Sequence, residues 1–329
     1  MNPAPADGVI HPVYLPFTEQ QLADHFAQVA SGDPGDHLAY YRASAARAAA
    51  LEASPPTGTP AEKRRAIRWG RQMEKDERFW VATTLMRLLH APNPVTLLAE
   101  TLRSCLGDTP PDSLSSWEAA LGEKQFVYFE ASLPSPTGYR HQLARQLNER
   151  ILVPYLREAA KQSGQALEGP TKTDALLICP DTGFAVVFEA KVISDISTGV
   201  QFDVLRNQIA RTIDVMLDPN PHLQPPLSER RPERTCFVLI TPEIFRENLE
   251  GRLYGWLLPA YQRDPGLLQR HLPHRQLADL ESVPKRLGWL TWEDCNACTP
   301  APARGFSTAS PRLKSRTKGD LAAAYGRQA

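Results

Sequence analysis

The chain has 329 residues, of which 42% are hydrophobic, and its 37 lysines and arginines balance 37 aspartates and glutamates. The apolar fraction excludes global disorder, and the length allows about one to three domains. A net charge of zero provides no overall field that attracts nucleic acid or an anionic membrane, so the chain as a whole is unlike a typical DNA-binding protein.

The compartment is predicted from features that the sequence lacks. No apolar run approaches the roughly 18 residues of a membrane span, and the N-terminus has neither the basic region nor the apolar block of a signal peptide. The five cysteines are few and mostly lie in apolar surroundings, as reduced thiols usually do. We therefore expect a soluble, cytoplasmic protein without a membrane partner.

The first third of the chain is predicted to be mainly helical, with prolines between the helices. The expected helices cover 18–53 (as one or two helices), 61–90 and 95–122, the last one interrupted by Pro110 and Pro111. They define two expected regions: an acidic segment rich in proline and alanine at 1–60, and a helical region at 61–124.

From residue 125 the pattern changes to helices alternating with short apolar runs, which predicts a third region at 125–300. The expected helices are 139–160 and 201–217, and the expected strands are 126–129, 175–179, 184–188 and 235–240. Because the last of these runs has no polar alternation, it is predicted to be buried on both faces. Residues 301–329 carry six basic residues and one acidic residue, and we expect a basic, disordered tail.

The stretch 171–191 carries the most informative pattern. A four-residue loop at 180–183 predicts an antiparallel hairpin in which Cys179 lies opposite Phe184. The same register places Asp174 directly across from Glu189, with Cβ atoms roughly 4.5–5.5 Å apart. Lys191, two residues further, projects from the same face of its strand as Glu189. Two carboxylates and a lysine are therefore expected to converge at one end of an apolar hairpin.

Two opposed carboxylates at the edge of a core are unfavourable unless something neutralises them. A divalent cation would do so, and oxygen-only ligation suits Mg²⁺ or Mn²⁺ better than zinc. The alternative is a solvated hairpin end in which Lys191 pairs with one of the acids. The apolar strands, the register and the helix that follows favour the metal site.

With these residues in place, the chain resembles the PD-(D/E)XK nuclease superfamily over roughly residues 125–295. Thr173-Asp174 occupies the "PD" position, with threonine in place of proline, and Glu189-Ala190-Lys191 supplies E-x-K. The resemblance implies an α/β (α+β) fold with a restriction-endonuclease-like αβββαβ core, a mixed central sheet flanked by helices, and a mainly helical region before it. The first strand of that core is either 165–167 or, if the order is altered, 126–129.

The resemblance also implies roles for the motif residues. Asp174 and Glu189 would hold Mg²⁺ together with the backbone carbonyl of Ala190, and Lys191 would orient the attacking water or stabilise the transition state.

Further site residues are expected on the neighbouring helices. Gln208 resembles a glutamine that many relatives contribute to the active site, and Arg211, three residues later on the same side of the helix, could contact phosphate. Some relatives add a glutamate from the first core helix, for which Glu149 is the first candidate and Glu158 the second. An ordinary solvated surface is the competing interpretation for all four.

Two other patterns could carry function. His271, His274, Cys295 and Cys298 have the residue types of a His₂Cys₂ zinc site, but their order is the reverse of a zinc finger, so we favour incidental cysteines over zinc. On the expected helix at 61–90, one face repeats basic residues and could bind nucleic acid or be solvated: Arg64, Arg68, Arg71, Lys75 and Arg78.

The function predicted from the sequence is metal-dependent hydrolysis of phosphodiester bonds in nucleic acid, with DNA favoured over RNA. The alternative is a catalytically inactive module on the same fold that binds nucleic acid or protein, and a helical adaptor carrying an α+β domain is a third hypothesis. A homodimer is left open.

Overall fold

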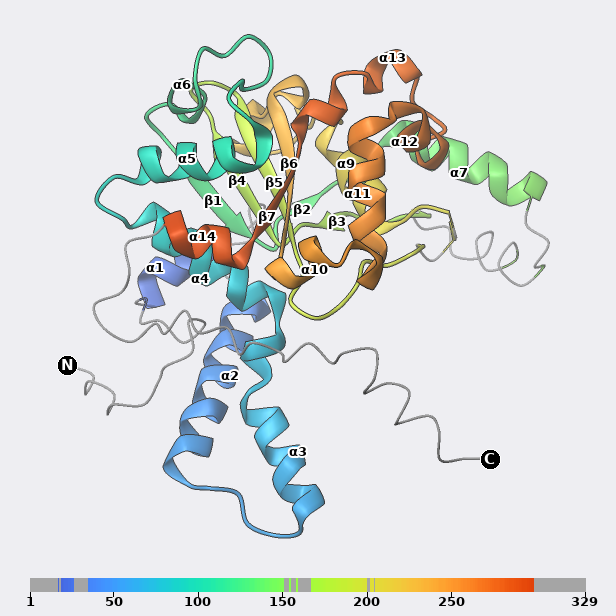
Figure 1. Ribbon diagram of the computed structural model, residues 1–329. Coiled ribbons are helices and arrows are strands. Elements are labelled where there is room, and N and C mark those ends of the chain that lie inside the picture. Colours follow the sequence, from blue (N-terminus) through green and yellow to red (C-terminus); the bar gives the residue numbers. More distant parts are fainter. Residues whose placement is uncertain are drawn as a thin grey trace, which may run out of the picture. The chain divides into compact units, whose positions relative to one another are not determined.

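The computed structural model describes residues 17, 19–26, 35–150, 154, 158, 167–199, 202–203 and 205–298. Residues 11–300 group as one compact unit. The fold is mixed α/β, with a five-stranded central sheet and a helical N-terminal region (Figure 1).

The strands of the central sheet come mainly from the second half of the chain. They are β1 (Phe126–Phe129), β4 (Ala175–Cys179), β5 (Phe184–Ala190), β6 (Thr235–Thr241) and β7 (Leu287–Thr291), and they lie in the order β1-β4-β5-β6-β7. The first three are antiparallel, whereas β5, β6 and β7 are parallel. A separate two-stranded sheet pairs β2 (Ser132–Leu133) with β3 (Thr171–Lys172).

The hairpin register predicted from the sequence is confirmed. Cys179 pairs with Phe184 and Ala175 with Phe188, so the residue that precedes β4, Asp174, falls opposite Glu189. The strand expected at 235–240 is also confirmed, and every residue of β6 is buried. Of the two candidates for the first strand, 126–129 forms β1, Leu167 lies outside any strand, and 165–166 lie outside the described residues.

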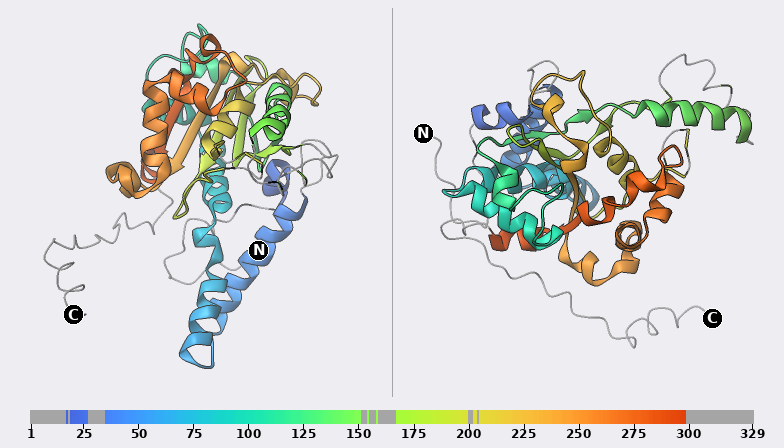
Figure 2. Two further views of the ribbon diagram at one scale, coloured as in Figure 1. Left: turned by 90° about the vertical axis from the view of Figure 1, so that its right-hand side faces the viewer. Right: turned by 90° about the horizontal axis from the view of Figure 1, so that it is seen from above.

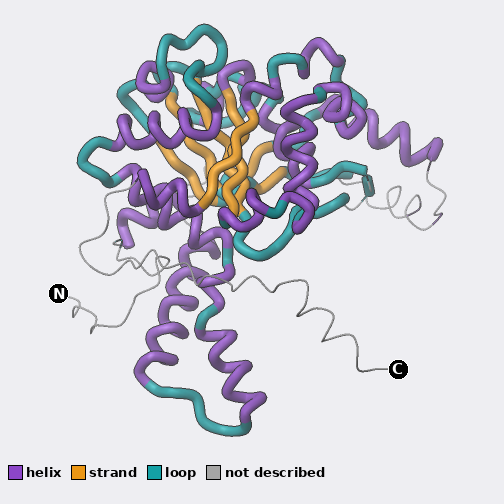
Figure 3. The backbone as a smooth tube through the Cα atoms, viewed as in Figure 1, coloured by secondary structure: helices purple, strands orange, loops and turns teal. Residues whose placement is uncertain are grey.

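Helices cover both faces of the sheet (Figures 1 and 3). The N-terminal part supplies α1 (Glu19–Phe26), α2 (Gly35–Ala53), α3 (Pro60–Gly70), the 3₁₀ helix η2 (Gln72–Lys75), α4 (Glu77–Leu89), α5 (Pro94–Leu106) and α6 (Trp117–Leu121). The remainder supplies α7 (Thr137–Arg150), α9 (Gln208–Met216), α10 (Glu243–Glu247), α11 (Leu253–Arg263), α12 (Pro265–His271), α13 (Leu277–Leu280) and α14 (Trp292–Cys298).

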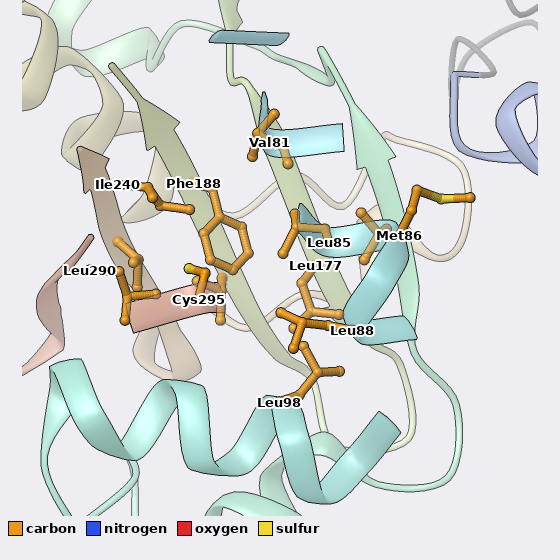
Figure 4. Packing of buried hydrophobic residues seen from close by; sticks show 14 of the residues in the cluster. Val81, Leu85, Met86, Leu88, Leu98, Leu177, Phe188, Ile240, Leu290 and Cys295 are labelled. Carbon is orange, nitrogen blue, oxygen red and sulfur yellow. The ribbon is translucent and has the colours of Figure 1, made fainter. Parts of the chain in front are cut away.

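Alternation along the strands divides the core into two layers. On β5, Val186 and Phe188 face a cluster formed with α4, α5, α6 and α14, whereas Ala185 and Val187 face a second cluster formed with α9, α11 and α12. Figure 4 shows the first layer, to which Leu85 and Leu88 of α4, Leu98 of α5 and Leu177 and Phe188 of the sheet contribute. Helices 77–106 therefore belong to the same core as the strands beyond residue 125.

Two expected helices differ from the structure. The helix expected at 61–90 is divided, because α3 ends at Gly70 and Asp76 caps a new helix by accepting from the Arg78 backbone N–H. The helix expected at 201–217 begins only at Gln208, where Asn207 accepts from the Ala210 backbone N–H. Of the helix expected at 139–160, α7 covers the part up to Arg150, and most of the rest lies outside the described residues.

No described helix is both long enough and apolar enough to span a bilayer.

Candidate functional site

The predicted residues Asp174, Glu189 and Lys191 converge at the carboxyl end of β5. By strand alternation, Asp174 and Glu189 belong to the sheet face that α9 covers. Asp174 Oδ2 accepts a hydrogen bond of 2.7 Å from the Ala190 backbone N–H, and Lys191 Nζ lies 2.6 Å from Glu189 Oε1. Three polar groups therefore meet where the apolar strands end.

The backbone around these side chains is held on several sides. The Lys191 N–H donates to the Ile240 carbonyl of β6, and Trp292 Nε1 donates to the Lys191 carbonyl. On the opposite side of the hairpin, the Glu130 N–H donates to the Asp174 carbonyl. Because these bonds link the ends of four strands, β1, β4, β5 and β6, the positions of the three side chains are set by the sheet and not by a free loop.

Burial differs between the three side chains. Glu189 is 1% exposed and Lys191 7% exposed, whereas Asp174 is partly exposed. Asp174 is therefore the least buried of the three residues.

The electrostatics of the site follow from this burial. Desolvation raises the pKa of Asp174 well above its usual value, and the nearby charge of Glu189 raises it further. Desolvation also raises the pKa of Glu189, although Lys191 opposes this shift. For Lys191, desolvation lowers the pKa, but the Glu189 and Asp174 carboxylates outweigh it and leave the pKa raised. The lysine is therefore a cation at neutral pH, beside carboxyl groups that bind protons more readily than usual.

Gln208, the glutamine to which the family resemblance pointed, contacts the site. It is the first residue of α9, and its Nε2 donates to Glu189 Oε1, the same oxygen that Lys191 contacts. Its Oε1 accepts from the Ser197 backbone N–H at 3.2 Å, and its own backbone N–H donates to the Ser197 carbonyl. The amide is therefore oriented from both ends, with its NH₂ group toward Glu189.

Glu77 is a site residue that the sequence analysis missed. It opens α4, and its charge raises the pKa of Asp174, Glu189 and Lys191. Ser194, three residues after Lys191, donates a hydrogen bond to Glu77 Oε1. The sequence feature that could have pointed to Glu77 is Asp76. Aspartate is favoured as a helix N-cap, so Asp76 indicates that a helix begins at Glu77.

The other glutamate candidates differ from Glu77. The side chain of Glu149 lies outside the described residues, and Glu158 is exposed. Whether the first core helix brings a glutamate to this site therefore stays a prediction.

Arg211 contacts the segment before β3 in this structure, and its expected contact with phosphate stays a prediction. Its Nε lies 3.0 Å from Glu168 Oε1, and its guanidinium donates to the carbonyls of Gly169 and Pro170 at 3.2 Å. It therefore holds the segment that leads to β3 and Asp174.

Glu168 belongs to a buried charged network beneath α9. Arg206, 0% exposed, donates to both Glu168 oxygens at 3.2 Å, and its Nη1 lies 2.8 Å from Asp214 Oδ2. The Arg206 guanidinium also stacks 3.5 Å from the centre of the Tyr139 ring of α7. This network ties the segment before β3, which leads to Asp174, to the segment that presents Gln208.

The four residues of the zinc pattern do not come together as a set. His271 Nδ1 bonds to the Tyr261 hydroxyl, and His274 Nε2 lies 3.0 Å from Asp214 Oδ1, both in the layer of α9 and α11. Cys295 packs in the cluster on the other face of the sheet, and the Cys298 side chain lies outside the described residues.

The expected basic stripe is also divided, because its members lie on three successive helices. Arg64 and Arg68 lie on α3, where both are exposed. Arg71 follows α3 and pairs with Glu74 at 2.8 Å, Lys75 is exposed in η2, and Arg78 of α4 pairs with Asp76 at 2.6 Å.

The site offers two protein carboxylates, Asp174 and Glu189, as metal ligands. Among the residues that the structure describes, no three His, Cys, Asp or Glu side chains are grouped closely enough to hold a metal ion. Asp174 and Glu189 fit Mg²⁺, because this ion is commonly held by one or two carboxylates and keeps water or phosphate oxygens as its other ligands.

In comparisons with known proteins, no family model, curated protein or solved structure matches the chain.

Proposed function

We propose that the protein is a Mg²⁺-dependent nuclease that hydrolyses phosphodiester bonds, with DNA as the favoured substrate. The observation that carries the proposal is the buried Lys191–Glu189 pair opposite Asp174 at the end of an apolar hairpin. A scaffold that only binds a partner has no need to hold opposed carboxylates at the edge of its core, where their desolvation is costly. The resemblance of Asp174 and Glu189-Ala190-Lys191 to the PD-(D/E)XK pattern supports the same conclusion.

Each residue has a part in this proposal. Asp174 and Glu189 bind the metal, whose chemistry is to lower the pKa of a bound water and to neutralise charge on phosphate oxygens. Lys191, held by Glu189, places a positive charge where the attacking water and the phosphate meet. Gln208 fixes the orientation of the Glu189 carboxylate. Asp174, the more accessible carboxylate, faces the incoming substrate.

The proposal is tested by incubating the purified chain with DNA and RNA in the presence of Mg²⁺, Mn²⁺ or EDTA. The Asp174→Ala variant is expected to lose cleavage by about a hundredfold or more. Asp108→Ala, which changes an exposed aspartate outside the site, is the matched control. Absence of metal-dependent cleavage of every substrate, or equal activity in Asp174→Ala and wild type, would refute the nuclease assignment and favour the inactive binding module.

Metal binding is expected to release protons, because the raised pKa values of Asp174 and Glu189 mean that the metal-free site retains protons at a pH where ordinary carboxyl groups are ionised. The affinity for Mg²⁺ should therefore increase as the pH rises and these carboxyl groups lose their protons. Isothermal titration calorimetry in buffers of different ionisation enthalpy measures the proton release directly. A heat of binding that is independent of the buffer would contradict this prediction.

Glu77→Gln is expected to weaken Mg²⁺ binding by about tenfold, because Glu77 adds negative charge near the two ligands without joining them. Asp174→Asn should reduce the affinity much further, because it removes a ligand. Glu123→Gln, at an exposed glutamate outside the site, is the control. If Glu77→Gln and Glu123→Gln have equal affinities, Glu77 has no role in the metal site.

A further inference from the structure

Helix α3 is unusually solvent-exposed for part of a folded unit. Every residue from Pro60 to Trp69 is exposed, and only Gly70 is buried. Figures 1 and 2 show α2 and α3 side by side as an antiparallel pair that extends away from the sheet. Because α3 contributes almost nothing to the core, packing alone does not explain its composition.

One side of α3 is fixed against α2 by a close approach at Gly70. A Cβ at this position would lie 2.7 Å from Leu51 Cδ2, so a larger residue would force the Leu51 side chain of α2 to move. Beside this contact, the Arg47 guanidinium of α2 lies 4.5 Å from the centre of the Trp69 ring. The side of α3 that carries Gly70 therefore faces α2, and the opposite side is the outward face.

Arginines occupy the outward face of α3. With about 100° per residue, Arg64, Arg65 and Arg68 each lie at least about 120° around the helix from Gly70. Among the described residues, none of these three arginines forms an ion pair, so their charge is available to a ligand. Four basic residues and one acidic residue give α3 a net charge of +3, and that one acid, Glu62, is occupied in capping the helix by accepting from the Thr59 N–H at 2.8 Å.

We infer that the outward face of α3 binds the phosphate backbone of double-stranded DNA. This inference rests on the proposed function, because the DNA that α3 binds is the substrate of the candidate site. Arg64 and Arg68 are separated by about 6 Å along the helix axis, close to the roughly 6.8 Å of two nucleotide steps along one strand. Single strands are bound by rows of aromatic side chains, whereas α3 has only Trp69, which already contacts Arg47. Although the chain has a net charge of zero, α3 is locally cationic, and its face with Arg64, Arg65 and Arg68 is called the cationic arm.

The test measures binding separately from cleavage. Fluorescence anisotropy of a labelled DNA duplex in EDTA is compared between wild type and the triple variant Arg64→Ala, Arg65→Ala, Arg68→Ala. Alanine favours helix, so α3 is retained, and circular dichroism verifies this. The charge-matched control replaces three exposed cations outside the arm with alanine: Lys124, Arg270 and Lys285.

The α3 variant is expected to bind the duplex at least about tenfold more weakly, and the slope of log K against log salt should fall by about 0.9 for each phosphate that the arm no longer neutralises. The control should stay within about twofold of wild type, and a triple Arg→Lys variant should retain most of the affinity because it keeps the charges. Equal losses in the two alanine variants would overturn the inference. The inference would also be overturned if the wild-type protein did not bind the duplex. The same holds if the α3 variant lost binding to phosphatidylserine vesicles but not to DNA.

The two proposals can fail independently. Duplex binding through α3 without cleavage in Mg²⁺ or Mn²⁺ would refute the nuclease and leave the DNA-binding arm in place. Cleavage that requires Asp174, combined with unchanged binding by the α3 variant, would refute the arm and leave the nuclease in place.

Discussion

Replacement of Lys191 by methionine is expected to slow Mg²⁺-dependent cleavage by about 100- to 1,000-fold, while the metal still binds. Methionine approximates the length of the lysine side chain but removes the cation that lies 2.6 Å from Glu189 Oε1. Because Asp174 and Glu189 remain, the defect should be in the rate of the chemical step and not in the affinity for Mg²⁺. Single-turnover cleavage at saturating metal measures the rate, and calorimetry measures the affinity.

The control for this variant is Lys285→Met, which alters an exposed lysine outside the site. Unchanged cleavage by Lys191→Met would show that the buried lysine is structural. A variant that loses Mg²⁺ binding and cleavage together would show that Lys191 supports the metal ligands and does not act on the reacting groups.

Replacement of Arg206 by methionine is expected to lower the free energy of unfolding by about 3 kcal/mol. Arg206 is fully buried and bridges Glu168 and Asp214, so its removal leaves two buried carboxylates short of a partner. The loss of stability should lie at the lower end of the range that is typical of a broken buried ion pair, because Arg211 still contacts Glu168 and Arg275 still contacts Asp214. Urea unfolding followed by circular dichroism measures the change.

The matched variant is Arg211→Met, which removes a more exposed arginine from the same carboxylate, Glu168. Its expected cost is about 1 kcal/mol or less, because Arg211 is partly exposed, so that solvent screens its charge, and because Glu168 retains Arg206. Equal destabilisation by the two variants would contradict a structural role that depends on burial.

The buried network also explains how distant segments are brought to one site. Glu168 lies shortly before the strand pair that leads to Asp174, and Arg206 lies two residues before Gln208. The ion pair between them joins the two segments on the α9 side of the sheet. Arg206→Met should therefore also loosen the Gln208–Glu189 contact.

The hairpin itself was predictable from local sequence. Two apolar runs separated by a four-residue loop fix one register, and the pleat then places Asp174 and Glu189 on one face, as the structure confirms. The Gln208 position could be anticipated only through the family resemblance, since its contact with Glu189 spans 19 residues and an intervening loop.

The helices were less predictable, because their boundaries depend on competing local signals. The charge and apolar pattern of 61–90 is continuous enough to suggest one helix, yet the Asp76 cap starts a new one and places Glu77 at its first turn. The end of α3 at Gly70 separates Arg64 and Arg68 from Lys75, and the Asp76 cap separates all three from Arg78. Interpreting the basic residues as one stripe was therefore wrong, whereas α3 alone presents a coherent face.

By itself the sequence determined the hairpin, its register and the convergence of Asp174, Glu189 and Lys191, because turn length and strand alternation are local properties. Only the tertiary structure decided that β1 flanks β4 although α7 and the β2–β3 pair come between them in the chain. It also decided that Glu77, far from Asp174 in the sequence, lies near enough for its charge to raise the pKa of Asp174. Such contacts arise when helices pack on both faces of a sheet, and the energy of that packing depends on the whole core and not on any one segment.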